Sequence, residues 1–250
     1  MHRLLVASGI LEGERVALPP DAAHHLKVVR PRPGETVELF DGAGRSRIYA
    51  CGNAVGDPLV AAGAVATFPP PAVRLTLFAC VTKGSRWDWT IEKATELGVA
   101  RIVPVISARC IVRLAPGERA AKRARWQRVA EDAARQSDAK WLPEICEAVD
   151  FEDALALAKP CVCFAGALAD PPPEPLLTAL RHCPRDAGTA SYGLFVGPEG
   201  DFTPEELKRL LEIAVPANFG PTVLRAETAA LYGVAVLMAA FTAEARGRAR

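Results

Sequence analysis

The segment that most constrains the fold is residues 195–230, where a glycine-containing turn leads into a helix-start signal. Apolar residues alternate with smaller ones at 192–196, which predicts a buried strand ending at Gly197. The turn Gly197-Pro198-Glu199-Gly200 follows, and its glycines allow positive φ and close approach of the backbone to a ligand. Thr203-Pro204-Glu205-Glu206 is then a capping box with proline at the first helical position. This order predicts the ligand-binding edge of an open α/β sheet.

A second strand–turn–helix arrangement is expected within the same segment. The helix after the capping box has one apolar face, formed by Leu207, Leu210, Leu211 and Ala214. A short apolar run that ends at Val223 and Leu224 is expected to be a strand, and a helix is expected at 228–243. That helix is rich in small residues, so another backbone can approach it closely. Either half alone fits an ordinary strand–turn–helix pair equally well, whereas the two together are more specific.

The motifs of this segment resemble those of the RsmE family. The resemblance rests on Gly197-Pro198-Glu199-Gly200 and on the block of residues 224–229, Leu-Arg-Ala-Glu-Thr-Ala. RsmE proteins are S-adenosylmethionine-dependent methyltransferases of the SPOUT superfamily, which methylate N3 of a uridine in 16S ribosomal RNA. The resemblance implies a SPOUT-type α/β domain over residues 72–250. It also implies a C-terminal trefoil knot, with the knot and the cofactor site at about 194–245.

The resemblance also implies roles for individual residues. Arg225 would donate to the developing negative oxygen of the uridine, and Glu227 would orient Arg225 or accept a proton. The alternative is that these two residues form a simple exposed ion pair. The cofactor S-adenosylmethionine would be held largely by backbone groups, at Gly197, Pro198, Glu199, Gly200, Leu224, Thr228 and Ala229. SPOUT proteins are usually dimers, and the small-residue helix fits a homodimer interface.

Residues 1–70 are predicted to form a separate domain. Short apolar runs are separated by turn signals, and one short helix is expected from Asp21, which would cap it. Several short strands with one helix suggest a small barrel. Residues 24–30, 33–34 and 40–42 resemble the PUA-like RNA-binding β-barrel of the RsmE family. Phe68-Pro69-Pro70-Pro71 is a stiff linker and the expected domain boundary.

Beyond the linker, strands and helices alternate. Residues 73–81 and 101–106 are predicted strands, and the helix between them has a capping signal at Ser85 and Asp88 and ends at Gly98. Lys83-Gly84 and residues 91–99 resemble a further RsmE block. This alternation predicts a mainly parallel sheet with helices on both sides.

The distribution of charge suggests an RNA surface. The net charge is +1, but residues 101–140 carry ten Lys or Arg against four acids. Such a region could hold phosphates, and a solvated helix face is an equally good explanation. With the family resemblance, the predicted RNA contacts are Arg3, His25, Arg30, Lys83, Arg86, Arg109, Lys122 and Arg123.

The composition predicts a cytoplasmic protein. The seven cysteines are scattered and odd in number, which favours reduced thiols. The N-terminus has no long apolar run, so we expect no signal peptide and no membrane partner. Neither Cys161 with Cys163 nor the pair His24-His25 matches a standard zinc pattern, so we expect no metal.

Some positions depart from the RsmE pattern. Ala108, Ala139 and Thr222 stand where charged residues are common in the family, and Asp201 replaces a glycine. These departures motivate an alternative, a non-catalytic RNA-binding protein that retains the fold. A nucleotide- or phosphate-binding enzyme is a second alternative, weakened because the chain has neither a P-loop lysine nor a Gly-x-Gly-x-x-Gly pattern.

Overall fold

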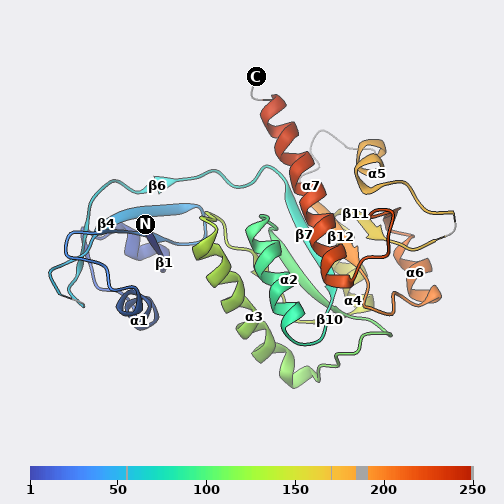
Figure 1. The fold of residues 1–250 in the computed structure, drawn as a ribbon, viewed down its shortest axis with the longest axis horizontal. Helices are drawn as coiled ribbons and strands as arrows, with labels where there is room; N and C mark the ends of the chain where they lie inside the picture. Colours follow the sequence, from blue (N-terminus) through green and yellow to red (C-terminus); the bar gives the residue numbers. More distant parts are fainter. Residues whose placement is uncertain (55, 170, 184–190, 249–250) are drawn as a thin grey trace. The chain divides into compact units, whose positions relative to one another are not determined.

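The computed structural model describes residues 1–54, 56–169, 171–183 and 191–248, with the side chains of 244–248 left out (Figure 1). Two compact units divide the chain. The first unit comprises Met1–Pro70 and Glu131–Leu142, and the second comprises Pro71–Ala130 and Pro143–Arg250. The linker predicted at residues 68–71 lies at the boundary, but the first unit also takes in the stretch around the end of the basic helix, which sequence analysis assigned to the second domain.

The first unit is built on a six-stranded sheet in the order β1-β3-β4-β5-β2, with β6 paired to β4. The β1–β3 pair is parallel and the other pairs are antiparallel. Buried Val37, Leu39 and Tyr49 lie at the centre of its apolar core. The elements are β1 (His2–Leu5), a 3₁₀ turn (Ser8–Glu12), β2 (Arg15–Val16), α1 (Pro20–Val29), β3 (Thr36–Phe40), β4 (Arg45–Ala50), β5 (Leu59–Ala61) and β6 (Ala66–Thr67).

The second unit contains a seven-stranded sheet in the order β10-β8-β7-β12-β11-β13, with β9 paired to β8. All of its strand pairs are parallel, which confirms the predicted α/β fold. Its strands are β7 (Arg74–Cys80), β8 (Arg101–Ile106), β9 (Glu144–Ile145), β10 (Val149–Asp150), β11 (Val162–Gly166), β12 (Ser191–Val196) and β13 (Ala214–Ala217). Its helices are α2 (Ser85–Glu96), α3 (Pro116–Gln136), α4 (Phe151–Ala158), α5 (Leu176–His182), α6 (Pro204–Leu210) and α7 (Ala226–Arg248), of which α3 extends into the first unit.

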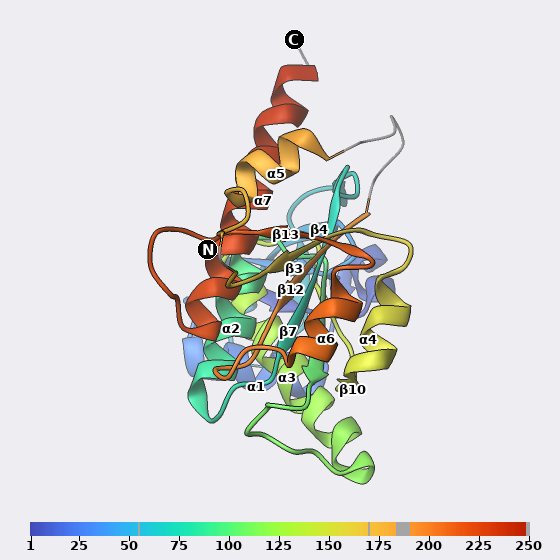
Figure 2. The ribbon, with the colours of Figure 1, turned by 90° about the vertical axis from the view of Figure 1, so that its right-hand side faces the viewer.

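Helices cover both faces of this sheet because its strands are apolar on both sides. Successive side chains of a strand point to opposite faces. Accordingly Leu75 and Leu77 of β7 belong to one buried cluster, with residues of α2, α3, α5 and α7. Phe78 belongs to the other cluster, with residues of α4 and α6, and its ring stacks on Phe195 of β12 at 4.5 Å. Figure 2 shows α2 and α7 on one side of β7 and β12, and α4 and α6 on the other.

Four local expectations are corrected. Pro19, not Asp21, is the N-cap of α1, and Gly84, not Ser85, is the N-cap of α2. Residues 223–224 form no strand and lie in the loop before α7. Ala214 begins β13 instead of continuing α6, because the helix ends four residues earlier. Gly98, with φ of +86°, follows the end of α2 as predicted.

Candidate active site

A cavity of about 310 Å³ lies in the second unit, beyond the carboxyl ends of β11, β12 and β13. This is the edge at which open parallel sheets bind ligands, and the volume falls at the lower end of the range for ligand pockets. Its walls come from three loops and the first turns of α7. The lining residues are Gly166, Ala167, Leu168, Val196, Gly197, Pro198, Glu199, Asp201, Ala217, Asn218, Phe219, Thr222, Val223, Leu224, Arg225, Ala226 and Ala229.

The glycine loop after β12 has a fixed conformation. The predicted capping box is confirmed, because the Thr203 hydroxyl accepts from the Glu206 amide and the Glu206 carboxylate accepts from the Thr203 amide. Asp201 has φ of +57° and its Oδ1 accepts from the Phe202 amide at 2.7 Å. Asp201 therefore adopts the left-handed conformation, which aspartate tolerates better than most residues. The turn is preserved despite the loss of a glycine.

Two arginine side chains, one from α2 and one from the loop after β8, contact this glycine loop. Arg86, at the start of α2, contacts Glu199 at 3.3 Å. Arg109 donates through Nη1 to the carbonyls of Gly200 at 2.9 Å and Phe202 at 3.3 Å. Both arginines were predicted as RNA contacts, and both contact the glycine loop that lines the cavity. These contacts hold Glu199, Gly200 and Phe202, and they keep this wall of the cavity in one geometry.

The opposite wall, at the ends of β11 and β13, was missed by sequence reasoning. Gly166 ends β11, and a Cβ placed there would lie 2.7 Å from the Phe219 ring. Ala217 and Phe219 follow from β13, which pairs with β11 in parallel. The available signal was the apolar run at residues 161–165, which is typical of a buried strand. Because parallel strands end at one edge, the residues after that strand belonged with the glycine loop.

The two predicted catalytic residues lie in different surroundings. Arg225 is exposed, lines the cavity, and directly precedes α7. Glu227 is buried in the first turn of α7 and does not line the cavity. Its Oε2 has no hydrogen-bond partner in the described part of the chain. No ion pair between these two residues is found within the described residues, so the exposed ion pair considered from sequence is not formed.

Six of the predicted cofactor and catalytic residues therefore share one cavity. They are Gly197, Pro198, Glu199, Leu224, Arg225 and Ala229. Gly200, Thr228 and Glu227 lie next to these residues in the chain but outside the lining. The set is mostly backbone and small side chains with one arginine, which suits a ligand held by main-chain groups and a reaction that needs a localised positive charge.

Comparison with known proteins identifies the family of this chain. The model of the RNA methyltransferase domain family matches residues 69–238. The ribosomal RNA small subunit methyltransferase E of Mycobacterium tuberculosis is 33% identical over 229 residues, which cover 89% of this chain and 86% of that protein. The chain belongs to the ribosomal RNA small subunit methyltransferase E family.

Other members of the methyltransferase E family are also similar. The Bacillus subtilis protein is 30% identical over 167 residues, 66% of this chain and 65% of its own length. The crystal structure of the Neisseria gonorrhoeae protein, bound to S-adenosyl methionine, has a TM-score of 0.80 and 28% identity, covering 96% of this chain and 98% of that one. The alignment with the solved structure extends over both units of this chain.

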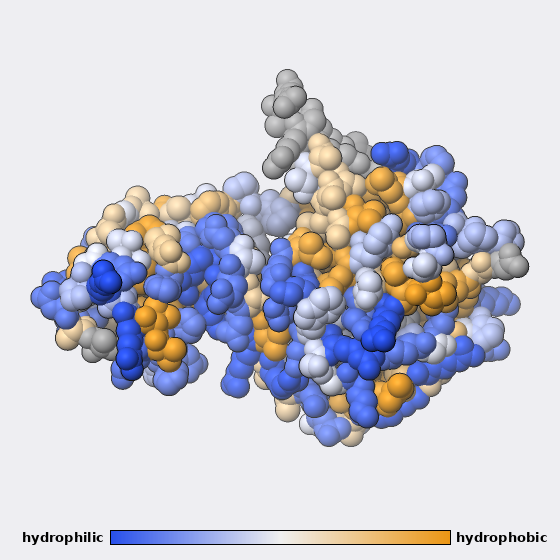
Figure 3. Space-filling model, viewed as in Figure 1, coloured by the Kyte–Doolittle hydropathy of each residue, from blue (hydrophilic) through white to orange (hydrophobic). Residues whose placement is uncertain are grey.

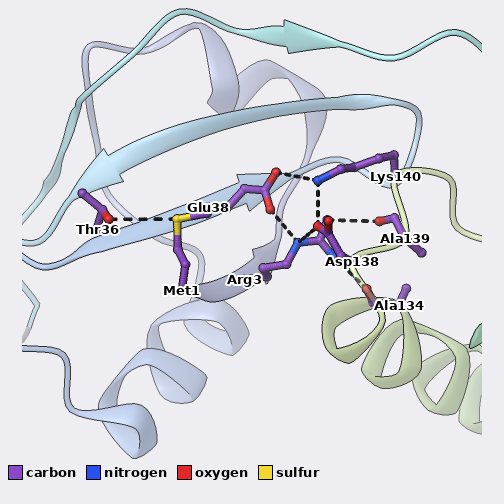
Figure 4. Close-up of polar contacts among 8 residues, drawn as sticks. All are labelled: Met1, Arg3, Thr36, Glu38, Ala134, Asp138, Ala139 and Lys140. Atoms are coloured by element: carbon purple, nitrogen blue, oxygen red, sulfur yellow. Dashed lines mark hydrogen bonds and ion pairs between the residues drawn. The ribbon is translucent and has the colours of Figure 1, made fainter.

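The predicted RNA contacts of this family member are dispersed. Arg3 is 8% exposed, and Figure 4 shows its guanidinium directed at protein acceptors. It contacts Glu38 at 2.6 Å and the carbonyls of Ala134 and Ala139 at 2.8 and 3.1 Å. Arg3 therefore makes its contacts within the protein, and protein atoms cover its guanidinium.

The remaining predicted RNA contacts lie closer to solvent. His25 is half-buried in α1, whereas Arg30 and Lys83 are exposed in loops. Arg123 of α3 is exposed but donates to the Ile145 carbonyl at 2.9 Å. Lys122, on the same helix, is half-buried and makes no hydrogen bond or ion pair to any residue that the structure describes.

The loop that carries Arg109 also holds the buried thiol of Cys110, which lies close to the buried thiol of Cys80 at the end of β7. Cys80 and Cys110 both contact the Ser107 hydroxyl at 3.4 Å. Hydrogen bonding from Cys80, followed by that from Ser107, outweighs burial and lowers the pKa of Cys110 to about 6. Burial raises the pKa of Cys80 well above its ordinary value. Neither thiol lines the cavity, so this pair packs behind the loop rather than in the site.

Among the described residues, no cluster of three or more His, Cys, Asp and Glu has a geometry that could hold a metal ion. Residues 226–243 of α7 are long and apolar enough to cross a membrane by length and composition alone, and a third of that segment is buried. Because α7 packs on α2, α5, β7 and β12, its apolar composition is explained by that packing.

Proposed function

We propose that the protein transfers a methyl group from S-adenosylmethionine to N3 of a specific uridine in the 16S ribosomal RNA of the small ribosomal subunit. The observation that carries the proposal is the glycine-walled cavity with Arg225 in its wall, in a chain of the methyltransferase E family. The N. gonorrhoeae relative of the same fold is bound to S-adenosyl methionine in its crystal structure.

The residues of the cavity fit this cofactor. At Gly197 an added Cβ would meet Asp201 Oδ1 at 3.0 Å and the Phe202 ring at 3.3 Å. At Gly166 it would meet the Phe219 ring at 2.7 Å. Both walls therefore leave little room for a side chain at these two positions, and their backbone groups at Gly197–Glu199 and Gly166–Leu168 would hold the cofactor. Leu224 and Ala229 would supply apolar contact.

The chemistry assigned to Arg225 follows from its place. When bound, S-adenosylmethionine supplies a methyl carbon activated by a neighbouring sulfonium. Uridine N3 carries a proton at neutral pH, so the nucleophile forms only as negative charge develops on the base. Arg225 is the cationic side chain in the cavity wall, and its guanidinium would stabilise that charge as it develops. Glu227 is a positioning residue, since it is buried behind the wall.

Substitution of Arg225 tests this function. Arg225→Ala should lower single-turnover methylation of small subunits by about 10²–10³, the usual cost of losing one such donor. Affinity for S-adenosylmethionine should stay near normal, because backbone groups hold it. Arg225→Lys should recover part of the rate, since a point charge does not reproduce a planar fork of donors. Raising the pH should partly rescue Arg225→Ala, because more uridine is then deprotonated.

The controls separate the candidate functions. Arg181→Ala removes an exposed arginine from α5, outside the cavity, and should leave rate and affinity unchanged. A wild-type protein that binds RNA but gives no methyl transfer would support the non-catalytic RNA-binding alternative. Loss of cofactor affinity in proportion to rate in Arg225→Ala would make Arg225 a binding residue and remove the proposed mechanism.

The proposal also assigns roles to each unit. The first unit, with its mostly antiparallel sheet, would be the PUA-like RNA-binding barrel, assisted by exposed Arg30 and half-buried His25. Residues 194–245 would form the trefoil knot of the SPOUT domain. In support, the loops after β11, β12 and β13 and the start of α7 all line one cavity.

A homodimer formed through the second unit and a cytoplasmic location complete the proposal. Figure 3 shows apolar residues gathered on the face that carries α7. Exposed apolar side chains at Leu168, Val223 and Tyr232 belong to α7 and the loops of the cavity. The seven cysteines, all in the described part of the chain, form no disulfide, which fits a reducing compartment.

A further inference from the structure

A second cavity, of about 380 Å³, lies in the second unit between the start of α2 and α3. It is distinct from the cofactor cavity, because the two share no lining residue. Its polar lining comes from three segments. They are the β7–α2 loop with Thr82, the first turn of α2 with Ser85, Trp87 and Asp88, and α3 with Lys122 and Arg125. Val112, Leu114 and Trp126 form its apolar wall.

The first feature of this cavity is the uncapped N-terminus of α2. The N-cap is Gly84, with φ of +70°, and it has no side chain to accept from the first turn. The 12-residue helix therefore leaves first-turn amides without the usual capping oxygen. Such amides, aligned with the helix dipole, favour an anion.

The second, independent feature is a set of three buried polar atoms without partners. Thr82 is 3% exposed and Trp87 is 2% exposed. Thr82 Oγ1, Trp87 Nε1 and Asp88 Oδ1 have no hydrogen-bond partner among the described residues. Leaving a buried donor unsatisfied costs about 1–3 kcal/mol, so native structures rarely do it. Because all three residues line the cavity, a ligand entering it is the natural partner for these atoms.

The charges in the cavity specify the chemistry of that ligand. Asp88 is the acidic residue of the lining, and its Oδ2 pairs with Arg125, which neutralises it. Lys122 makes no contact with another charged group in the part of the chain that the structure describes. An indole N–H, hydroxyls, helix amides and one unpaired ammonium then face the ligand. Donors and positive charge outnumber the one unpaired acceptor, Asp88 Oδ1, so the cavity fits a negatively charged acceptor, which is a phosphate. A phosphate of an RNA chain comes with neighbouring ribose 2′-hydroxyls, which can donate to Asp88 Oδ1.

We propose that this cavity binds a phosphodiester group of the RNA substrate at the N-terminus of α2. The inference rests on the proposed function and adds a specific phosphate contact to it. Lys122 supplies charge, and Thr82, Ser85, Trp87 Nε1 and the α2 amides supply hydrogen bonds. The same chemistry fits inorganic phosphate, so the test compares the two sources.

Affinity for a ribosomal RNA fragment, measured across salt concentrations, tests the site. Lys122→Gln should weaken binding and reduce the slope of log affinity against log salt by about 0.7–0.9, the value for one lost phosphate contact. Lys159→Gln, the same change at an exposed lysine of the α4 end, should alter neither quantity. Equal salt slopes in wild type and Lys122→Gln would overturn the proposal.

The hydroxyl of Thr82 gives a charge-neutral test. Thr82→Val keeps the volume and should lower RNA affinity on the order of tenfold, with the salt slope unchanged and thermal stability equal or higher, since an unpaired buried hydroxyl is removed. Thr82→Ser should restore the affinity. A purely structural role would instead lower stability in Thr82→Val and leave RNA affinity unaltered, which would refute the site.

The indole N–H resonance of Trp87, assigned by its loss in Trp87→Phe, reports directly on the cavity. Addition of RNA should shift it downfield, and less so in Lys122→Gln. A shift with millimolar inorganic phosphate but none with RNA would refute RNA as the ligand. S-adenosylmethionine affinity and methylation are measured in parallel. Wild-type methylation together with unaltered RNA binding in the variants rejects this site alone, whereas absent methylation in wild type rejects the proposed function.

Discussion

Replacement of Glu38 by glutamine in the first unit should be strongly destabilising. The Arg3–Glu38 pair is 2.6 Å long, with side-chain exposures of 7% and 6% (Figure 4). Lys140 makes a second contact to the same carboxylate at 3.1 Å. Removing one partner of a buried pair costs about 3–5 kcal/mol, because the other charge stays buried. Two backbone carbonyls still accept from Arg3 in the variant, so we expect about 3 kcal/mol, the lower end.

The pH dependence of this loss has a defined sign. Burial raises the pKa of Glu38, but hydrogen bonds from Ser46, Arg3 and Lys140 outweigh it and hold the pKa below its ordinary value. A depressed carboxyl pKa contributes stability that is present above the unfolded-state pKa of about 4.3 and lost as pH falls through the folded-state value. The stability difference between wild type and Glu38→Gln should therefore be full at pH 6–7 and shrink below about pH 4.

Urea denaturation of both proteins at several pH values measures this difference. The matched control is Glu12→Gln, which removes the exposed partner of Arg45 and should cost about 0–1 kcal/mol. A loss below 1 kcal/mol for Glu38→Gln at pH 7, equal to the control, would refute the reasoning. The same experiment bears on Arg3, since an RNA-binding arginine without a structural role would show normal stability when its partner is removed.

Three further outcomes are expected. Gly166→Ala drives a methyl group into the Phe219 ring and should weaken S-adenosylmethionine binding about tenfold by calorimetry, whereas Gly9→Ala, with open space around it, should have no effect. Arg109→Ala removes two hydrogen bonds to the glycine loop and should weaken cofactor affinity on the order of fivefold in the same assay. Sedimentation at micromolar concentration should show a dimer, and only a 26.6 kDa species would contradict this.

Local signals in the sequence were sufficient to predict one wall of the cavity proposed to hold the cofactor. The capping box at Thr203 and the tolerance of Asp201 for positive φ depend on residues three apart or fewer, so they could be predicted from the segment itself. The prediction of a strand at Val223 also relied on local signals alone, and it was wrong. An apolar run predicts a strand only where a neighbouring strand can pair, and Val223 is 75% exposed in a loop.

Contacts between distant segments could not be predicted in this way. Gly166 and Phe219 meet because β11 and β13 are parallel neighbours, a register that local patterns do not encode. Burial of Arg3 depends on Glu38 and on carbonyls more than 130 residues away, at the end of α3. A charged side chain is exposed by default, so the sequence favoured an RNA contact there.

The first turn of α2 connects the two cavities of the second unit. Ser85 lines the cavity proposed to hold phosphate, and the next residue, Arg86, contacts Glu199 in the wall of the cofactor cavity. Adjacent residues on one helical turn move together, so a ligand that fixes the α2 N-terminus also fixes the brace on the glycine loop. Arg86 was predicted as an RNA contact on charge and resemblance. Its geometry gives a different reason for an arginine at this position, because it would join the proposed phosphate site to the proposed wall of the cofactor site.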